Sequence, residues 1–287
     1  MKNFCDIPEK YSLYENAKIA IVPVAFDKTS TWIKGSDNGP TAIIEASKKL
    51  ELYDIETDSE VYKTGIYTDS QIKDETSTSS LIQTVENRVK QHLTKDKFVI
   101  TFGGEHTVSI GAAKAHANFY KKDFCVLQLD AHADLRNIYY SDKNNHGCVM
   151  ARIKEFCPIV QVGIRSMSWE EKNQNSKDRI FFAKDIYNNH KWIPNVVNLL
   201  SENVYVTIDL DVFDPAVMPS TGTPEPGGLF WYDVIALLKQ VANSKNVVGF
   251  DVVELCPNEK NKAPDFLAAK LTYKFLSYIF KENKSEQ

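Results

Sequence analysis

The sequence predicts an α/β fold in which a mostly parallel sheet of about eight strands is covered by helices on both faces. Short apolar runs rich in β-branched residues alternate with longer segments whose apolar residues recur at helical three-and-four spacing. The runs CVLQL (125–129) and VVGFDVV (247–253) are almost continuously apolar, as strands buried on both faces are. No internal repeat or low-complexity linker interrupts the chain, so one domain is expected over residues 1–287.

Each expected strand is a short apolar run enriched in valine, isoleucine, phenylalanine or tyrosine. In chain order the strands are Ile19–Phe26, Val61–Tyr67, Phe98–Phe102, Phe124–Asp130, Ile159–Ile164, Ile180–Phe182, Val204–Asp209 and Val247–Leu255. The expected helices carry an apolar stripe and are Gly39–Tyr53, Ser80–Leu93, Thr107–Tyr120, Trp231–Ala242 and Ala263–Phe280. Pro40 supports the first helix, because proline is favoured near the first helical position. The polar stretch Asp69–Ser80 is expected to be a surface loop.

Composition and charge argue against several classes of function. The net charge is −4, and basic residues cluster no further than pairs such as Lys48-Lys49 and Lys121-Lys122, so neither nucleic-acid nor membrane-surface binding is expected. The N-terminus lacks the apolar core of a signal peptide and no apolar run approaches membrane-spanning length, which favours a cytoplasmic enzyme. The five cysteines show no close paired spacing, so neither a disulfide framework nor a zinc ribbon is expected.

Polar residues with catalytic or metal-binding potential stand at the ends of four expected strands. In chain order they are Gly103-Gly104-Glu105-His106, Asp130-Ala131-His132-Ala133-Asp134, Asp209-Leu210-Asp211, and Asp251 with Glu254 just beyond it. In an open parallel sheet a site forms outside the carboxyl ends of the strands, so these residues are expected to lie together. A single histidine or aspartate at a strand end is more often a cap or a satisfied core group. Six histidines and aspartates stand at the first three of these strand ends, and this accumulation argues against that interpretation.

The spacing within two of these groups is typical of metal ligands. Strand side chains alternate between faces, so Asp209 and Asp211 point the same way if the backbone stays extended, and so do Asp130, His132 and Asp134. Neighbouring carboxylates repel one another, and a divalent cation between them would offset the cost of burying them. The alternative for Asp209 and Asp211 is that aspartate often starts a loop after a strand.

The ligand types indicate which metal and which chemistry such a site would support. The candidate ligands are aspartates and histidines without a thiolate, a set that suits manganese, iron, cobalt or zinc, and the excess of carboxylate favours manganese. The negative charges of the aspartates match two divalent cations, so two Mn²⁺ ions per chain are expected. Two cations lower the pKa of a shared water enough to supply a hydroxide at neutral pH.

Motifs along most of the chain resemble those of the ureohydrolase family, whose members hydrolyse guanidino groups to urea at a binuclear manganese centre. The metal motifs are GGEH (103–106), DAHAD (130–134) and DLDVFDPAVMPSTGTPEPGGL (209–229). The resemblance extends to NHG (145–147), VGIRS (162–166) and DVVE (251–254). Within the family, the segments TPEPGGL (223–229), GPTAI (39–43) and DLR (134–136) are more similar to agmatinases than to arginases.

Carried over position by position, the resemblance implies a fold and a ligand set. The fold is a three-layer α/β/α arrangement with a mostly parallel sheet of about eight strands, as in arginases and deacetylases, and the family forms homo-oligomers, usually trimers or hexamers. One metal would be held by His106, Asp130, Asp134 and Asp209, and the other by Asp130, His132, Asp209 and Asp211. Glu105 departs from the more frequent Asp and Asn145 from a common Ser, and neither is an expected ligand.

The expected reaction is hydrolysis of agmatine to putrescine and urea by attack of a metal-bridging hydroxide on the guanidinium carbon. Asp134 would pass a proton to the departing amine, and His146 would shuttle protons or contact the substrate. Glu254 would hold the planar guanidinium, because a carboxylate offers two acceptors in a matching fork. Arg136 would bind a substrate carboxylate or form a surface ion pair, and Asp142 is a candidate partner for the terminal ammonium of agmatine.

Three alternatives stay open at this point. The substrate could be another guanidino compound, such as guanidinobutyrate or arginine, and Arg136 would then bind its carboxylate. The chain could be a metal-binding relative without catalysis, although every expected ligand, His146 and Glu254 are present. Hydrolysis of an acylated polyamine or lysine on the same general fold would favour a single zinc, whereas the complete ligand set favours two metals.

Overall fold

The computed structural model describes residues 3–73, 76–174, 176–187, 189 and 191–281. Within these residues the strands form one eight-stranded sheet in the order β2-β1-β3-β8-β7-β4-β5-β6, and every neighbouring pair is parallel. The strands are β1 (Ile19–Val24), β2 (Ile66–Thr68), β3 (Phe98–Gly103), β4 (Phe124–Leu129), β5 (Ile159–Ile164), β6 (Ile180–Phe182), β7 (Asn203–Asp209) and β8 (Asn246–Val253). Each expected strand therefore has a counterpart in the sheet.

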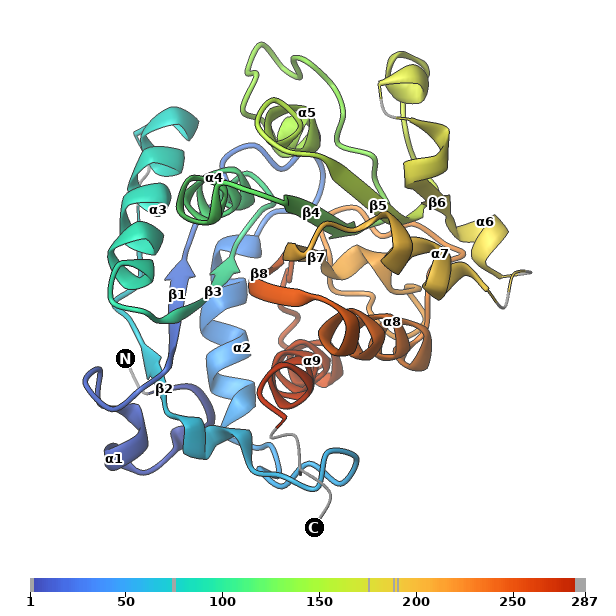
Figure 1. Ribbon diagram of the computed structural model, residues 1–287. Helices are drawn as coiled ribbons and strands as arrows, with labels where there is room; N and C mark the ends of the chain where they lie inside the picture. The colour runs from blue at the N-terminus through green and yellow to red at the C-terminus, as the bar shows by residue number, and fades with distance from the viewer. Residues whose placement is uncertain (1–2, 74–75, 175, 188, 190, 282–287) are drawn as a thin grey trace.

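Helices cover both faces of this sheet, as the three layers in Figure 1 show. One face carries α3 (Thr78–Leu93), α4 (Val108–Tyr120) and α5 (Val149–Ile153). The other face carries α2 (Gly39–Ser47), α7 (Trp192–Leu199), α8 (Trp231–Ser244) and α9 (Ala263–Ile279). The short helices α1 (Glu9–Ser12) and α6 (Ala183–Ile186) complete the described set. The predicted α/β/α fold is confirmed, and none of the described helices could span a membrane.

The two faces of the sheet bury separate hydrophobic clusters, which explains why its strands are almost continuously apolar. Every residue of β4 is buried, and alternate residues enter different clusters. Cys125 and Leu127 pack with the helices α2, α7, α8 and α9, whereas Phe124 and Val126 pack with α3, α4 and α5. A strand covered on both sides has no solvent face, so the sequence shows no alternation of polar and apolar residues.

The first expected helix, Gly39–Tyr53, is shorter in the structure. It ends as α2 at Ser47, whose hydroxyl donates to the Ile44 carbonyl at 2.7 Å and also accepts the Cys5 amide at 2.7 Å. The segment after it forms turns because its side chains are committed to tertiary contacts, described below for Asp54. Four short helices, α1, α5, α6 and α7, were not expected, since each is too brief to show a full apolar stripe.

The second expected strand, Val61–Tyr67, is also shortened. Val61–Thr64 forms a 3₁₀ turn, and β2 begins only at Ile66. Gly65 separates the two with a φ of 88°, a left-handed conformation that glycine adopts readily. The apolar run therefore predicted the edge strand correctly but not its start.

The expected surface loop Asp69–Ser80 is anchored at both ends. Asp69 is buried, and its Oδ2 lies 2.8 Å from Arg88 Nη1 and 2.9 Å from His92 Nε2 on α3. At the other end, the Ser77 side chain caps α3 by accepting the Ser80 amide, so the last residues of the stretch are helical. Residues 74–75 lie outside the described part of the chain.

Lys274 of α9 holds the turn that follows α2. Its ammonium lies 3.0 Å from both carboxylate oxygens of Asp54 and 2.7 Å from a carboxylate oxygen of Glu56. Lys274 and Asp54 are both buried. Burial alone would raise the pKa of Asp54, but the Thr57 amide and Lys274 hold it below its usual value. A group with a depressed pKa stabilises the fold above its unfolded pKa, and this contribution is lost as the pH falls.

Lys274→Met is expected to lower the free energy of unfolding by about 3–5 kcal/mol at pH 7, because it leaves Asp54 buried without its cation. The loss should shrink below about pH 4, where Asp54 of the variant can be protonated. Urea unfolding at neutral and acidic pH measures both values, with Lys260→Met as an exposed lysine control. An equal loss at both pH values would contradict the assignment.

Candidate metal centre

The sheet order brings the predicted site residues to one edge. Strands β3, β8, β7 and β4 are consecutive neighbours, and their carboxyl ends lead into the segments that begin at Gly104, Glu254, Leu210 and Asp130. Residues that are more than a hundred positions apart in the chain therefore meet at the carboxyl ends of the four central strands. The predicted convergence of the strand-end residues is found in the structure.

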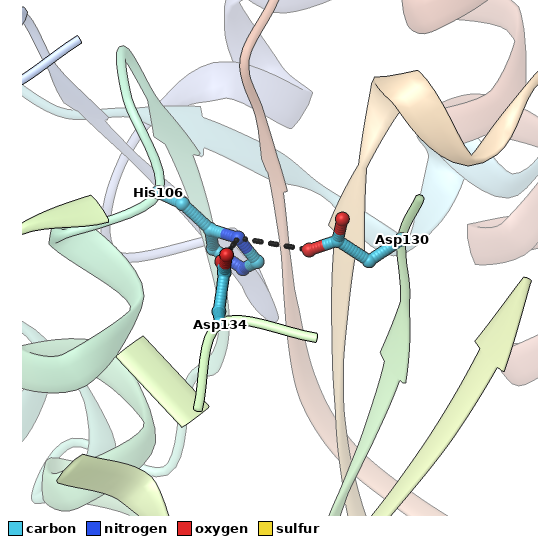
Figure 2. A group of neighbouring side chains, drawn as sticks. All are labelled: His106, Asp130 and Asp134. Atoms are coloured by element: carbon cyan, nitrogen blue, oxygen red, sulfur yellow. Dashed lines mark ion pairs between the residues drawn. The ribbon is translucent and has the colours of Figure 1, made fainter. Parts of the chain in front are cut away.

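His106 lies at the centre of the first group of candidate ligands. Its Nδ1 atom is 3.1 Å from Asp134 Oδ2, 3.2 Å from Asp130 Oδ2 and 3.4 Å from Asp209 Oδ2. Figure 2 shows His106, Asp130 and Asp134 grouped together, with both carboxylates near the Nδ1 atom of the His106 ring. All four side chains are buried, so water contributes little to balancing the carboxylate charges.

A second group shares Asp130 with the first. His132 Nδ1 lies 2.8 Å from Asp211 Oδ2 and 3.7 Å from Asp130 Oδ1. The candidate ligand atoms of Asp130, His132 and Asp211 lie within 4.8 Å of one another, as do those of His106, Asp130 and Asp134. Two adjacent groups with one carboxylate in common form a geometry suited to two neighbouring cations.

The hydrogen bonding of His106 tests whether a cation fits. Its Nε2 lies 2.8 Å from Thr207 Oγ1, and the Thr207 hydroxyl donates to Asp251 at 2.7 Å. The single hydroxyl hydrogen is used by Asp251, so Thr207 accepts from the Nε2–H of His106. The buried Nδ1 of His106 has no hydrogen-bond partner and faces carboxylate oxygens. Burial alone would lower the pKa of His106, but Asp130 and Asp134 raise it well above its usual value, so Nδ1 binds either a proton or a cation. A metal cation satisfies this arrangement of acceptors.

The same crowding shifts the protonation of the carboxyl groups. Burial, followed by the charge of Asp130, raises the pKa of Asp134 to about 7. Burial and then the charge of Asp211 raise the pKa of Asp209 well above its usual value, and burial and then Glu105 do the same for Glu254. Groups that are buried against like charges bind either protons or cations, so divalent metals would displace protons here.

The backbone reaches this geometry differently from the expectation of extended strands. After Asp209 the chain enters a 3₁₀ turn, Leu210–Val212, and Asp209 Oδ1 accepts the Asp211 amide at 2.9 Å. Asp134 adopts a left-handed φ of 53°. The condition of an extended backbone is therefore not met after Asp209 or at Asp134, where turns direct the carboxylates inward. Asp211 also accepts the Ala131 amide at 2.9 Å, which joins the two ligand segments.

Two glutamines that support Asp130 were missed in the sequence. Gln128 Nε2 donates to Asp130 Oδ2 at 2.7 Å, and Gln161 Nε2 donates to Gln128 Oε1 at 2.6 Å. The two residues are register partners on β4 and β5 and are fully buried. A lone glutamine in the middle of each apolar run was the available signal, because a buried amide needs specific partners.

Glu254, His146 and Arg136 line one cavity of about 230 Å³ together with candidate ligands His106 and Asp134. Glu254 is buried, and its Oε1 accepts the backbone amide of His106 at 2.8 Å. The cavity therefore joins the candidate ligands to the residues expected to contact the substrate.

Arg136 is not a free surface cation. Its guanidinium lies 4.1 Å from the centre of the Tyr139 ring, and its Nε is 3.5 Å from Glu171 Oε2. Tyr139 and Glu171 also line the cavity. Asp142 is held elsewhere, by the Thr78 hydroxyl at 2.7 Å, and lines a neighbouring pocket. Asp142, the candidate partner for the terminal ammonium of agmatine, therefore does not line the cavity that contains the candidate ligands.

The departures at Glu105 and Asn145 are accommodated locally. Asn145 caps the turn that carries His146 by accepting the Gly147 amide at 3.1 Å. Glu105 is buried and accepts the backbone amide of Thr29 at 2.8 Å. Both residues thus hold the segments around the cavity rather than enter the group of candidate ligands.

Comparisons with known proteins agree with this geometry. The family model described as "Arginase: Arginase family" matches residues 17–277. The chain belongs to the arginase family. The N(1)-aminopropylagmatine ureohydrolase of Synechocystis sp. is 34% identical, with 94% of this chain and 92% of that protein covered. The agmatinase of Pyrococcus horikoshii is 32% identical, with coverages of 90% and 91%.

Solved structures of arginase-family proteins share the fold. The agmatine ureohydrolase of Thermoplasma volcanium superposes with a TM-score of 0.88 at 33% identity, covering 98% of this chain and 95% of that one. The arginase of Bacillus subtilis, at 23% identity, superposes over 90% of this chain and 98% of that one with a TM-score of 0.77 and supports the fold. Arginase-family enzymes have binuclear metal centres. This chain is a hydrolase of the ureohydrolase type and carries a potential metal site.

In this arginase-family chain, Thr207→Val is expected to weaken metal binding about 10–100-fold, because outer partners orient metal-binding histidines. The change keeps the side-chain shape but removes the acceptor for the Nε2–H of His106. Thr207→Ser keeps the hydroxyl and serves as the matched control. Competition for Mn²⁺ with a chelator measures the affinity, and equal affinity of the valine variant and the wild type would contradict the role given to Thr207.

Proposed function

We propose that this chain hydrolyses agmatine to putrescine and urea at a centre of two manganese ions. The observation that carries the proposal is that two groups of candidate ligands share Asp130, while their other members line one cavity together with the buried carboxylate of Glu254. An oxygen-rich ligand set with only two imidazoles favours manganese over softer metals. The agmatinase and agmatine ureohydrolase names among the relatives support the substrate.

The residues that would hold the metals fall into two overlapping sets. The first set is His106, Asp130, Asp134 and Asp209, and the second is Asp130, His132, Asp209 and Asp211. When bound, the two cations supply a hydroxide nucleophile near neutral pH. Asp130 and Asp209 belong to both sets, so the removal of either residue should affect both ions.

The side chains around the centre bind the substrate and move protons. Glu254 would accept two N–H bonds from the guanidinium, which places the central carbon toward the candidate ligands. Asp134, which lines the same cavity, would pass a proton to the departing amine. His146, which lines the same cavity, would accept or relay protons.

The residues near Arg136 favour a cationic substrate over a guanidino acid. Glu171 and the face of Tyr139 already offset the charge of Arg136, which leaves less attraction for a substrate carboxylate. Glu225 adds a carboxylate 3.8 Å from His132 Nε2. A second candidate is N1-aminopropylagmatine, because relatives at 32–34% identity carry that ureohydrolase name. It has the same guanidino end and a longer cationic tail.

The deciding experiment measures urea release by the purified, manganese-loaded chain from agmatine, N1-aminopropylagmatine, arginine and guanidinobutyrate. Formamide release from formiminoglutamate is measured in parallel. A preference for agmatine supports the proposal, and a preference for N1-aminopropylagmatine supports the second candidate. Turnover of arginine or guanidinobutyrate would agree with the proposed metal chemistry. It would indicate that Arg136 binds the substrate carboxylate. No product, with two metals bound per chain, would overturn a guanidino substrate.

Metal content and assembly are part of the same proposal. Two metals per chain would argue against a single-zinc deacylase, and turnover would exclude a purely metal-binding relative. We also propose a cytoplasmic homo-oligomer, a trimer or hexamer, that binds a small guanidino substrate and neither nucleic acid nor membrane. Light scattering of the purified chain measures its oligomeric state.

A further inference from the structure

Thr29 connects the buried carboxylate of Glu105 to His146, the candidate proton carrier of the cavity. It lies on the segment after β1, and its backbone amide donates to Glu105 Oε2 at 2.8 Å. Its hydroxyl donates to Glu105 Oε1 at 2.8 Å, while Ser30 Oγ donates to Oε2 at 3.3 Å. Glu105 has no exposed surface, so its oxygens depend on these protein donors. The ionised carboxylate of Glu105 therefore receives the hydroxyl hydrogen of Thr29.

The same hydroxyl oxygen contacts His146 twice. Thr29 Oγ1 accepts the backbone amide of His146 at 3.0 Å and lies 3.0 Å from the Nδ1 atom of its ring. A hydroxyl has one hydrogen, and here Glu105 receives it. Thr29 can therefore only accept from Nδ1, which requires a hydrogen on that nitrogen.

This contact determines which ring nitrogen of His146 is free. Burial lowers the pKa of His146 below its usual value, so the ring is neutral at pH 7 and carries one hydrogen. With that hydrogen on Nδ1, the lone pair is on Nε2. The ring of His146 lines the cavity beside Tyr139, with ring centres 6.1 Å apart.

We propose that Thr29 is a positioning residue that holds His146 as its Nδ1–H tautomer and so keeps Nε2 as a proton acceptor for the cavity. Glu105 contributes by receiving the hydroxyl hydrogen of Thr29. Which molecule gives its proton to Nε2 rests on the proposed function. The tautomer of His146 does not depend on that function. The side chain of Glu105 is longer than that of the more frequent aspartate, and it reaches both the amide and the hydroxyl of Thr29.

Nitrogen-15 NMR of the histidine side chains tests the tautomer directly. The full-length chain is loaded with diamagnetic Zn²⁺, and the His146 signals are assigned by comparison with His146→Asn. The wild type should show a protonated Nδ1 and an unprotonated Nε2. A protonated Nε2 in the wild type would overturn the proposal without the use of any Thr29 variant.

Thr29→Val and Thr29→Ser form a matched pair for the functional consequence. Valine keeps the shape of threonine without the hydroxyl, and serine keeps the hydroxyl. The valine variant should lose the Nδ1–H tautomer and at least about tenfold in kcat, with KM and metal content little changed, because a positioned proton acceptor contributes a large factor to rate. The serine variant should resemble the wild type in tautomer and kcat.

The two readouts separate this proposal from the proposed function. An unchanged tautomer in Thr29→Val would overturn the role of Thr29, whatever the activity. A wild type with the expected tautomer that releases no urea from any guanidino compound would overturn the substrate class and leave the role of Thr29 standing. A loss confined to KM or to metal content would also count against a positioning role through His146.

Discussion

Asp209→Ala is expected to remove both metals and to reduce urea release to the background rate. Asp209 Oδ2 lies 3.4 Å from His106 Nδ1, and its Oδ1 orients the turn that carries Asp211. One substitution therefore withdraws a shared ligand and disturbs a second one. Elemental analysis of metal per chain and a urea assay with manganese in the buffer measure the two effects. Asp130→Ala, which removes the carboxylate common to both ligand groups, should behave in the same way.

The control for Asp209→Ala is Asp185→Ala, an exposed aspartate on α6 at the edge of the sheet. It should retain two metals and full activity. Thermal unfolding of each variant shows whether lost activity reflects a lost fold, and a folded Asp209 variant without metals supports the assignment. Full activity of Asp209→Ala or Asp130→Ala would disprove the shared binuclear centre.

Glu254→Gln is expected to weaken substrate use about 10–100-fold with metal content intact. Glutamine keeps an acceptor oxygen for the His106 amide, so the candidate ligand His106 should stay in place. It removes the negative charge that would pair with the guanidinium, and a hydrogen bond to a charged group contributes about 1.5–3 kcal/mol. The expected change is a higher KM with metal per chain equal to that of the wild type.

The control for Glu254→Gln is Glu259→Gln, an exposed glutamate in the segment that follows β8. It should leave KM and metal content unchanged. Loss of metal from Glu254→Gln would mean that Glu254 supports the metal centre rather than the substrate. An unchanged KM would mean that the guanidinium is held by another group of the cavity.

Much of the fold could be predicted because its signals are local. Each strand of a sheet covered on both faces is an apolar run, and each long helix carries an apolar stripe. The shortened elements show the limit of such signals. α2 stops at Ser47 because of hydrogen bonds to Ile44 and Cys5, and Asp54 is held by Lys274 from the far end of the chain. Periodicity contains no information about these contacts.

The sequence by itself determined the sheet, the candidate ligands and their shared edge. The reason is that parallel strands place their carboxyl ends together, so Asp130, Asp209 and Glu254 could be assigned to one site before their distances were known. Only the tertiary structure decided how they are oriented. Thr207 and Thr29 show no motif, yet each one directs a histidine hydrogen through a contact across at least a hundred residues of chain. Such contacts depend on how distant segments pack, and packing is established only in the folded chain.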